Sequence, residues 1–314
     1  MTGAGGFIGS RVMCALVNEG HSVVGGVRSL SHLRLSGELA RIARAENCEL
    51  VEVDLENPRS VSGLFDRAVD VVLHCASQQP RSGLGFDGYY RGNLASLSNV
   101  LDGMARRNIR RIVSFSTVVV YGDKLDMPVD EAHAVNPSNY YAISKYAADQ
   151  ILRCRSDQGD VDSVCLRLPS IFGNGQAGGL VHTYYDLLHS NQELEIYSCG
   201  KLRRNLLHVD DVVRACRLVV EKMDDFGGFN LFLIGSSNSL TMEEVARFMA
   251  REIGSRSHIK LVPHPAPVNC HWDLVLEKAW KAWGFVPVSI ESGISRYLEE
   301  MAYRDCELPR ESRH

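Results

Sequence analysis

The sequence predicts an α/β fold built on a doubly wound parallel sheet. Short apolar segments rich in β-branched residues alternate along the chain with segments of helical periodicity. The apolar segments hold few polar residues, which is typical of strands that helices cover on both faces. The apolar segments are residues 21–27, 50–54, 69–75, 112–116 and 163–168. The helical segments are residues 10–19, 31–45, 58–67, 89–107 and 138–155.

Beyond residue 168 the alternation loosens, which predicts a smaller C-terminal lobe over the sheet edge. Thr241 and Glu244 have the spacing of a capping box at the start of a helix. The further expected elements are a loop over 173–179, helices over 210–223 and 241–252, and a strand over 229–233. The expected division is a first domain of residues 1–168 with 206–233, a lobe of residues 169–205 with 234–303, and a frayed tail of residues 304–314.

Composition and charge exclude several classes of protein. The 314 residues are 45% hydrophobic and 23% charged, which is enough for a packed core. A net charge of −4 without a long basic run leaves no electrostatic footprint for nucleic acid. We expect no membrane partner, since no signal peptide and no run of about 18 apolar residues is recognised. The nine cysteines lack metal-type spacing, so we expect reduced thiols, no metal and a cytoplasmic location.

A glycine-rich segment opens the chain. It reads Thr-Gly-Ala-Gly-Gly-Phe-Ile-Gly-Ser over residues 2–10, with glycines at 3, 6 and 9, and a helical segment follows directly. Glycines let the backbone turn tightly and approach a pyrophosphate, which then lies at a helix N-terminus. Because a βαβ-like pattern follows, the segment predicts a Rossmann-type, dinucleotide-binding sheet rather than an ordinary turn.

We expect the first β-strand of such a sheet to precede the start of this sequence. The strand before the glycine-rich loop is central in a doubly wound sheet, yet Met1 alone precedes Thr2. We hypothesise that a short apolar strand is encoded upstream and that a valine codon is read as Met1. A chain extended by those codons is expected to be more soluble and to bind cofactor better, and an extension that changes neither rejects the hypothesis.

Arg28 bears on the choice between NAD and NADP. NAD-binding sheets usually offer a carboxylate about 20 residues after the glycines, but no Asp or Glu occurs from His21 through Gly37. A guanidinium at Arg28 suits the 2′-phosphate of NADP(H), and a solvated surface arginine is the alternative. Asp54 has two interpretations, as an acceptor for the adenine amino group or as the cap of a helix near Pro58.

Tyr141 and Lys145 stand four residues apart in a helical segment, so both side chains project from one face. A free tyrosine has a pKa near ~10, and we expect the Lys145 ammonium to lower the Tyr141 pKa. The lysine can also hold the nicotinamide ribose. Thr117 ends a predicted strand and can hydrogen-bond the same substrate oxygen. A tyrosine and a lysine at this spacing often occur together by chance. Hydride-transfer chemistry is predicted because the glycine-rich loop, Thr117 and the pair occur together in this order.

The chain resembles the extended short-chain dehydrogenases/reductases of the NAD-dependent epimerase/dehydratase family. The motifs that carry the resemblance span nearly the whole chain: TGAGGFIG (2–9), LHCAS (73–77), Asn93, SFSTVVVYG (114–122), YAISK (141–145), LRLPSIFG (166–173), RNLLHVDDV (204–212) and KAWKAWGFVP (278–287). The resemblance implies an NAD(P) cofactor and a homodimer that forms through the helix bearing Tyr141 and the one over residues 89–107.

The resemblance also implies site residues. Thr117, Tyr141 and Lys145 form the implied catalytic set. The expected cofactor contacts are Gly3, Gly6, Phe7, Ile8, Gly9, Arg28, Asp54, Leu55, Cys75, Ala76, Ser77, Asn93, Tyr141 and Lys145. The expected substrate contacts are Thr117, Ser170 and Arg204. Arg204 falls where many members bind a sugar-nucleotide pyrophosphate; a guanidinium fits phosphate bidentately, and an ordinary ion pair is the alternative.

Three positions depart from the family pattern. Val118 and Val119 stand where dehydratases carry an Asp-Glu pair, and neither can pass a proton to a leaving water, which rejects 4,6-dehydration. Ser170 stands where many sugar-nucleotide members have asparagine. The segment before Lys278 lacks the arginine that often completes the phosphate clamp.

The expected function is hydride transfer at a carbinol or ketone carbon, C4 of a nucleotide sugar. A 4-epimerase would remove the hydride to NAD and return it to the other face of the ketone. A 4-keto reductase would use NADPH once, with Tyr141 as proton donor. Two alternatives stay open, an NADPH-dependent reductase of a non-nucleotide carbonyl and a non-catalytic NADP-binding sensor or scaffold. The intact catalytic set argues against the last of these.

Overall fold

A parallel sheet lies at the centre of the computed structural model, which describes residues 1–31, 37–123, 127–176, 178–263 and 271–307. Its strands follow the spatial order β2, β1, β3, β4, β5, β10, with Thr2 between β1 and β3. Every strand pair in it is parallel. The strands are β1 Val23–Val27, β2 Cys48–Glu52, β3 Val71–His74, β4 Arg111–Thr117, β5 Asp162–Leu168 and β10 Phe229–Leu233. The predicted fold class is confirmed.

Met1 and Thr2 occupy the position at which the sequence predicts a first strand. Thr2 forms parallel bridges to Gly26 of β1 and His74 of β3. Its N–H donates to the Leu73 carbonyl at 2.9 Å, and the Gly26 N–H donates to the Met1 carbonyl at 2.8 Å. A single bridged residue therefore joins the two halves of the sheet. The hypothesis of an upstream strand stays a prediction.

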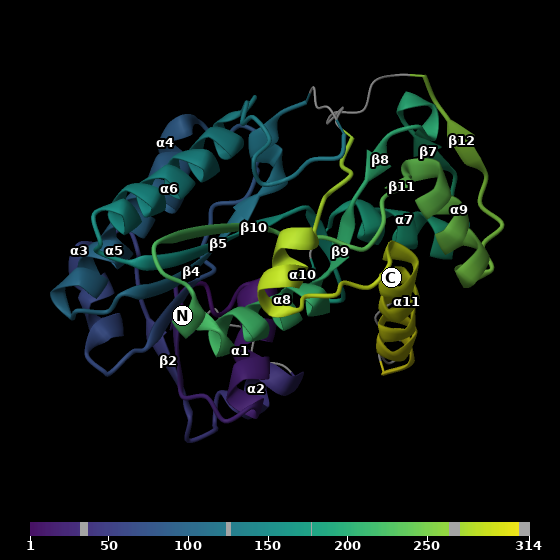
Figure 1. Cartoon of the computed structure of the whole chain (residues 1–314). Helices are drawn as coiled ribbons and strands as arrows, with labels where there is room; N and C mark the ends of the chain where they lie inside the picture. Colours follow the sequence, from purple (N-terminus) through teal and green to yellow (C-terminus); the bar gives the residue numbers. More distant parts are fainter. Residues whose placement is uncertain (32–36, 124–126, 177, 264–270, 308–314) are drawn as a thin grey trace.

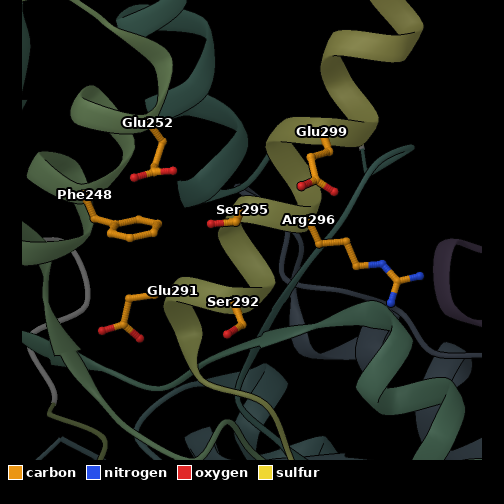
Figure 2. Close-up of a pocket in the computed structure, with 7 residues that line it drawn as sticks. All are labelled: Phe248, Glu252, Glu291, Ser292, Ser295, Arg296 and Glu299. Carbon is orange, nitrogen blue, oxygen red and sulfur yellow. The ribbon is translucent and has the colours of Figure 1, made fainter.

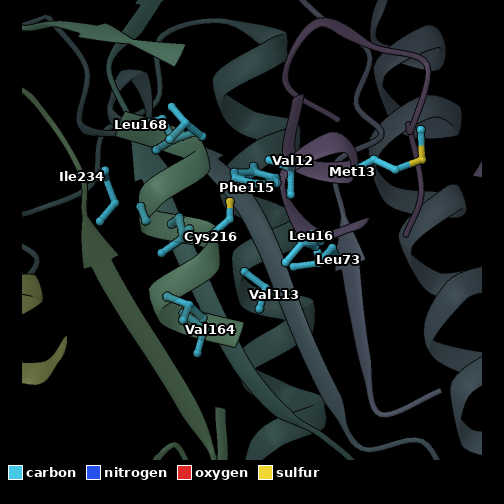
Figure 3. Packing of buried hydrophobic residues seen from close by; sticks show 14 of the residues in the cluster. Val12, Met13, Leu16, Leu73, Val113, Phe115, Val164, Leu168, Cys216 and Ile234 are labelled. Atoms are coloured by element: carbon cyan, nitrogen blue, oxygen red, sulfur yellow. The ribbon is translucent and has the colours of Figure 1, made fainter. Parts of the chain in front are cut away.

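Helices cover both faces of the sheet, as Figure 1 shows for α1 and α8 on one face and α5 and α6 on the other. Neighbouring residues of β4 point to opposite faces: Val113 packs with α1 and α8, and Ile112 packs with α5 and α6. Figure 3 shows the first of these two clusters, including Val12, Leu16, Val113, Phe115, Val164 and Cys216. The covering helices are α1 Phe7–Asn18, α2 Gly37–Ile42, α3 Pro58–Ser62, α5 Ser96–Arg106, α6 Tyr140–Asp157, α8 Val209–Glu221 and α10 Glu277–Trp283.

Three predicted helices differ from the structure. The segment over 89–107 is divided into α4 (Phe86–Tyr89), a π-helical turn (Tyr90–Ala95) and α5. The segment over 58–67 leaves α-geometry after Ser62 for the 3₁₀ turn η1 (Gly63–Phe65). The segment over 31–45 contains the single short helix α2, and its residues 32–36 lie outside the described residues. A periodic apolar pattern does not reveal such local changes of helix type.

The C-terminal segments form a second hydrophobic cluster with small sheets of its own, at the right of Figure 1. The predicted capping box is confirmed, since the Thr241 and Glu244 side chains each accept from the other's backbone N–H at the start of α9. The predicted fray from residue 304 is wrong up to Glu307, which ends α11, and residues 308–314 lie outside the described residues. The elements are β6 Ser170–Phe172, α7 Leu180–His189, β7 Leu194–Ile196, β8 Arg203–Arg204, β9 Leu206–His208, β11 Leu240–Thr241, α9 Met242–Ile253, β12 Ile259–Leu261 and α11 Ile290–Glu307.

Candidate active site

The glycine-rich loop is pressed against the end of β3. Gly3 has φ +65°, and a Cβ at this position would lie 2.7 Å from the Ala76 backbone nitrogen. A Cβ at Gly9 would lie 2.1 Å from the Gly3 carbonyl oxygen. No side chain caps the N-terminus of α1, which follows Gly6. An uncapped helix start beside a loop of bare backbone suits the pyrophosphate of a dinucleotide.

Arg28 and Asp54 follow the carboxyl ends of two neighbouring strands, β1 and β2. Both side chains are exposed. The Asp54 carboxylate accepts from the Glu56 N–H at 3.0 Å, whereas Asn57 caps α3 by accepting from Arg59. The interpretation of Asp54 as the helix cap is therefore wrong, because Asn57 stands directly before the first helical turn. Binding of adenine by Asp54 stays a prediction, as does the contact by half-buried Leu55.

Asn93 ties the loop after β3 to the helix that carries Tyr141. Its carboxamide oxygen accepts from the Ser77 hydroxyl at 3.0 Å and from the Gln78 N–H at 2.7 Å. Its Nδ2 donates to the Ser144 hydroxyl at 2.9 Å, and that hydroxyl donates to the Tyr141 carbonyl at 2.7 Å. Asn93 lies in the π-helical turn and is 3% exposed. The predicted cofactor residues Ser77 and Asn93 thus belong to one hydrogen-bond network that connects the loop after β3 to α6.

The structure brings Thr117, at the end of β4, to Tyr141 on α6. The Thr117 hydroxyl lies near the Tyr141 phenol, where it acts to lower the pKa of that group, and it accepts from the Val119 N–H at 3.3 Å. Asn139 fixes the start of α6 by accepting from the Ala142 N–H at 2.9 Å. Lys145 lies one turn further along α6 and is 6% exposed. These contacts align a hydroxyl, a phenol and an ammonium at the edge of the sheet where the glycine-rich loop ends.

Burial dominates the electrostatics of this set. It raises the pKa of Tyr141 to about 12, and the Thr117 hydroxyl opposes that rise. The expectation that the Lys145 ammonium lowers the Tyr141 pKa is wrong in this structure, because the loss of water around the phenol outweighs every favourable contact. Burial also lowers the pKa of Lys145, and the carboxylate of Asp149 opposes it. With a pKa of about 12 the Tyr141 phenol is protonated at neutral pH.

The predicted substrate residues lie on two adjoining strand pairs. Ser170 is exposed on β6 and stands opposite Leu206 of β9. Arg204 lies on β8, two residues before Leu206 in the chain, and is 9% exposed. Its charge acts to lower the pKa of Tyr184, which burial raises to about 12. Phosphate binding and an ordinary ion pair both remain open for Arg204.

Sequence reasoning missed a buried acid behind this set. Asp149 is 2% exposed and pairs with Arg167 of β5 at 3.0 Å. Its position four residues after Lys145 was the available signal, since that spacing repeats the spacing of Tyr141 and Lys145 on one helix face.

A pocket of about 630 Å³ lies away from these residues, between α9 and α11 (Figure 2). Three glutamates line it, and in Figure 2 the Arg296 side chain extends away from them. Its lining residues are Phe248, Glu252, Glu291, Ser292, Ser295, Arg296 and Glu299. None of the predicted site residues lines it, so it forms no part of the candidate active site.

His208, Asp210 and Glu300 can each bring one ligand atom within 4.8 Å of the other two. Arg296 already compensates the carboxylates, with Nη2 at 2.6 Å from Asp210. The expectation that the protein holds no metal stays a prediction.

Across the described ranges, no helix is both long and apolar enough to cross a membrane. The cysteines with free thiols include Cys14, Cys48, Cys75, Cys154, Cys165, Cys199 and Cys216.

A glycine-rich loop at the start of α1, beside a Thr, Tyr and Lys set at the same sheet edge, defines a class of dinucleotide-dependent α/β enzymes. The chain belongs to the NAD dependent epimerase/dehydratase family, which residues 1–235 match. It is thus an NAD(P)-dependent enzyme of the extended short-chain dehydrogenase type.

Individual relatives are distant but cover nearly the full chain. A putative UDP-glucose 4-epimerase of Methanocaldococcus jannaschii is 26% identical over 311 residues, 96% of this chain and 97% of that protein. The dTDP-D-glucose 4,6-dehydratase of Mus musculus is 26% identical over 253 residues, 79% of this chain and 70% of its own. The solved UDP-glucose 4-epimerase of Thermotoga maritima, with UDP-glucose, has a TM-score of 0.86 at 24% identity, covering 96% of this chain and 98% of that one.

Proposed function

We propose that this protein is a nucleotide-sugar 4-epimerase that transfers a hydride at C4 with Thr117, Tyr141 and Lys145 as its catalytic set. The observation that carries the proposal is the grouping of the Thr117 hydroxyl and the Tyr141 phenol, one turn from buried Lys145 and beside the glycine-rich loop. The 4-epimerases among its relatives support this choice of reaction.

NAD(P), when bound, supplies the hydride acceptor and donor. Gly3, Gly6 and Gly9 would hold its pyrophosphate at the start of α1, with Phe7 and Ile8 in the first turn. Cys75, Ala76, Ser77 and Asn93 would line it along the end of β3. The Lys145 ammonium would hold the ribose hydroxyls.

Tyr141 would move the proton at the C4 oxygen, and Thr117 would hold that oxygen by a second hydrogen bond. With a pKa of about 12 the phenol is protonated at neutral pH, so it carries the proton that reduction of the ketone requires in the second half of an epimerisation. In the first half Tyr141 must accept the sugar hydroxyl proton, so it must enter this step as a phenolate that has already lost its own proton to water. The charge of Lys145 would stabilise the phenolate at that stage, if binding of ligands brings the two groups together.

Dehydration is not proposed, although several relatives are dTDP-D-glucose 4,6-dehydratases. Val118 is 1% exposed and Val119 is half-buried, and both directly follow Thr117 on the turn η3 (Val118–Tyr121). Neither side chain can carry a proton to a leaving water. The chemistry then stops at the C4 ketone and its reduction.

A 4-keto reductase is the second candidate, and Arg28 is the observation that favours it. The exposed guanidinium follows β1 directly, where it suits the 2′-phosphate of NADP(H). Reductases consume a reduced cofactor in each turnover, whereas epimerases regenerate theirs. A reductase of a non-nucleotide carbonyl is consistent with Ser170 in place of asparagine.

We further propose a cytoplasmic homodimer with the two-part division given by residues 1–168 with 206–233 and residues 169–205 with 234–303. The described free cysteines support a reducing compartment. Large apolar side chains exposed near the start of α6 support a second copy of the chain as partner. These side chains are Phe86, Tyr90, Tyr140 and Ile143.

The test begins with a thermal-shift screen of NAD, NADP and UDP-, GDP-, CDP- and dTDP-sugars, because ligands that bind the native state raise its Tm. The sugars that bind are then incubated with the protein and no added cofactor. Conversion to the C4 epimer supports the epimerase, and stoichiometric oxidation of added NADPH with a 4-keto sugar supports the reductase. Failure of every nucleotide sugar in both assays overturns the proposal.

A further inference from the structure

Asp149 is a buried carboxylate on the same helix face as Tyr141 and Lys145. The three residues are spaced by four along α6, so their side chains follow one another on a single face. Asp149 is 2% exposed and Lys145 is 6% exposed. A carboxylate is rarely buried to this degree without a set of partners that stabilise its charge.

Those partners come from two strands. Asp149 Oδ2 accepts from the Ser116 hydroxyl of β4 at 2.9 Å, and from Arg167 Nε and Nη2 of β5 at 3.1 and 3.0 Å. Its Oδ1 accepts from the Cys165 thiol at 3.1 Å. Ser116 directly precedes Thr117, so the carboxylate connects α6 to the strand end that carries the catalytic hydroxyl. The Arg167 guanidinium lies over the Tyr121 ring, 4.9 Å from its centroid.

Among the described groups that act on the Lys145 pKa, Asp149 is the anion whose charge opposes the effect of burial. The His74 imidazole of β3 is neutral, since burial and the Lys145 ammonium lower its pKa to about 3. Burial raises the pKa of the Cys165 thiol well above its ordinary value and that of the Tyr141 phenol to about 12, so both are uncharged. The described titratable groups that interact with this set are the Met1 amine, His74, Tyr89, Tyr121, Tyr141, Asp149, Cys165 and Arg167.

We propose that Asp149 is a positioning residue that keeps the Lys145 ammonium charged in a dry site and anchors the Ser116–Thr117 strand end to α6. Arg167 pairs with the carboxylate, and the charge of the carboxylate acts to raise the Lys145 pKa against the effect of burial. The inference rests on the proposed function only for the role of Lys145 as a cofactor contact.

The test compares Asp149→Asn with wild type by calorimetric titration of NAD⁺ or NADP⁺, whichever binds wild type more tightly, from pH 6 to pH 10. Affinity falls as pH rises through the Lys145 pKa, since the ammonium is lost. Asp149→Asn lowers that pKa further, so the alkaline loss of affinity is expected about one pH unit earlier or more. At pH values below the Lys145 pKa of both proteins, the affinities are expected to converge.

Matched variants separate charge from structure. Asp149→Glu retains the charge and is expected to restore the wild-type pH profile even with weaker overall binding. Ser116→Ala removes one hydrogen bond and is expected to leave the profile within a few tenths of a unit. If Asp149→Asn fails to fold, Asp149→Asn/Arg167→Met removes both buried charges together and is measured instead.

A folded Asp149→Asn or double variant that binds cofactor with the wild-type pH profile overturns the inference, as does a loss of affinity that is equal at every pH. Because the titration uses cofactor alone, it gives the same answer whether or not any nucleotide sugar is a substrate. A failed sugar assay with a shifted profile rejects the proposed function and keeps the inference.

Discussion

The proposed cofactor side and the proposed substrate side of this protein are built by different means. The cofactor side is held by backbone contacts that allow no Cβ, as at Gly3 and Gly9, and by the hydrogen-bond network of buried Asn93. The substrate side uses an exposed Ser170 and Arg204 on a strand of two residues. A site fixed by backbone sterics tolerates little change, whereas a site made of side chains on short strands can change its ligand while the fold remains.

The largest expected effect lies where the two sides meet, at Tyr141. Tyr141→Phe removes the proton donor and keeps the ring, so turnover is expected to fall by about 10²–10⁴-fold. Cofactor affinity should stay near wild type. Steady-state kcat and a cofactor titration check both parts, and unchanged activity would contradict the assignment of Tyr141 to the chemistry.

On the cofactor side, Gly9→Ala tests the steric constraint. The added Cβ would lie 2.1 Å from the Gly3 carbonyl oxygen, so the loop must move. We expect a cost of about 1–3 kcal/mol in unfolding free energy, together with loss of cofactor binding. Gly63→Ala is the control, because nothing lies within 4 Å of its Cβ position and its φ is −64°. Equal Tm values for the two variants would remove the basis for a rigid cofactor side.

Arg28→Asp tests whether the cofactor side prefers NADP(H), which carries a 2′-phosphate, over NAD. Loss of a charge-assisted contact is expected to weaken NADP(H) binding about 10–100-fold while NAD binding stays within a few-fold. Dissociation constants for both cofactors measure the ratio directly. An unchanged ratio would return Arg28 to the alternative of a solvated surface arginine.

The substrate side is expected to respond more weakly. Arg204→Met should raise the KM for the nucleotide sugar about tenfold with little change in kcat, if the guanidinium binds phosphate. Arg247→Met, at an exposed arginine paired with Glu243, is the control for loss of a surface charge. A fall in Tm without a change in KM would favour an ordinary ion pair at Arg204.

His74 is expected to make the stability of the protein depend on pH. Its buried ring is joined to the Thr2 hydroxyl at 3.0 Å, and burial lowers its pKa from 6.5 to about 3. The folded protein keeps the ring neutral while the unfolded chain protonates, so stability is full above pH 6.5 and is lost as pH falls toward 3. The loss is at most about 1.4 kcal/mol per pH unit. Urea unfolding at pH 7, 6 and 5 measures it, and His74→Gln should flatten the slope.

Features set by local sequence could be predicted, whereas features set by contacts between distant segments could not. The sheet, the helix that carries Tyr141 and the capping box at Thr241 follow from local periodicity and spacing, and the structure has them. The π-helical turn around Asn93 and the partners of Asp149 depend on packing between segments far apart in the chain. The predicted direction of the Tyr141 pKa was wrong for the same reason, because burial depends on the whole fold.

Hydride transfer at C4 has a direct isotopic test. UDP-glucose that carries deuterium at C4 is incubated with the protein in ordinary water without added cofactor, and C4 of the products is followed by NMR. We predict UDP-galactose that retains the deuterium at C4, because the hydride leaves and returns within one site. Deuterium lost to solvent from C4 would contradict this chemistry, and absence of any epimer would contradict the choice of UDP-glucose as substrate.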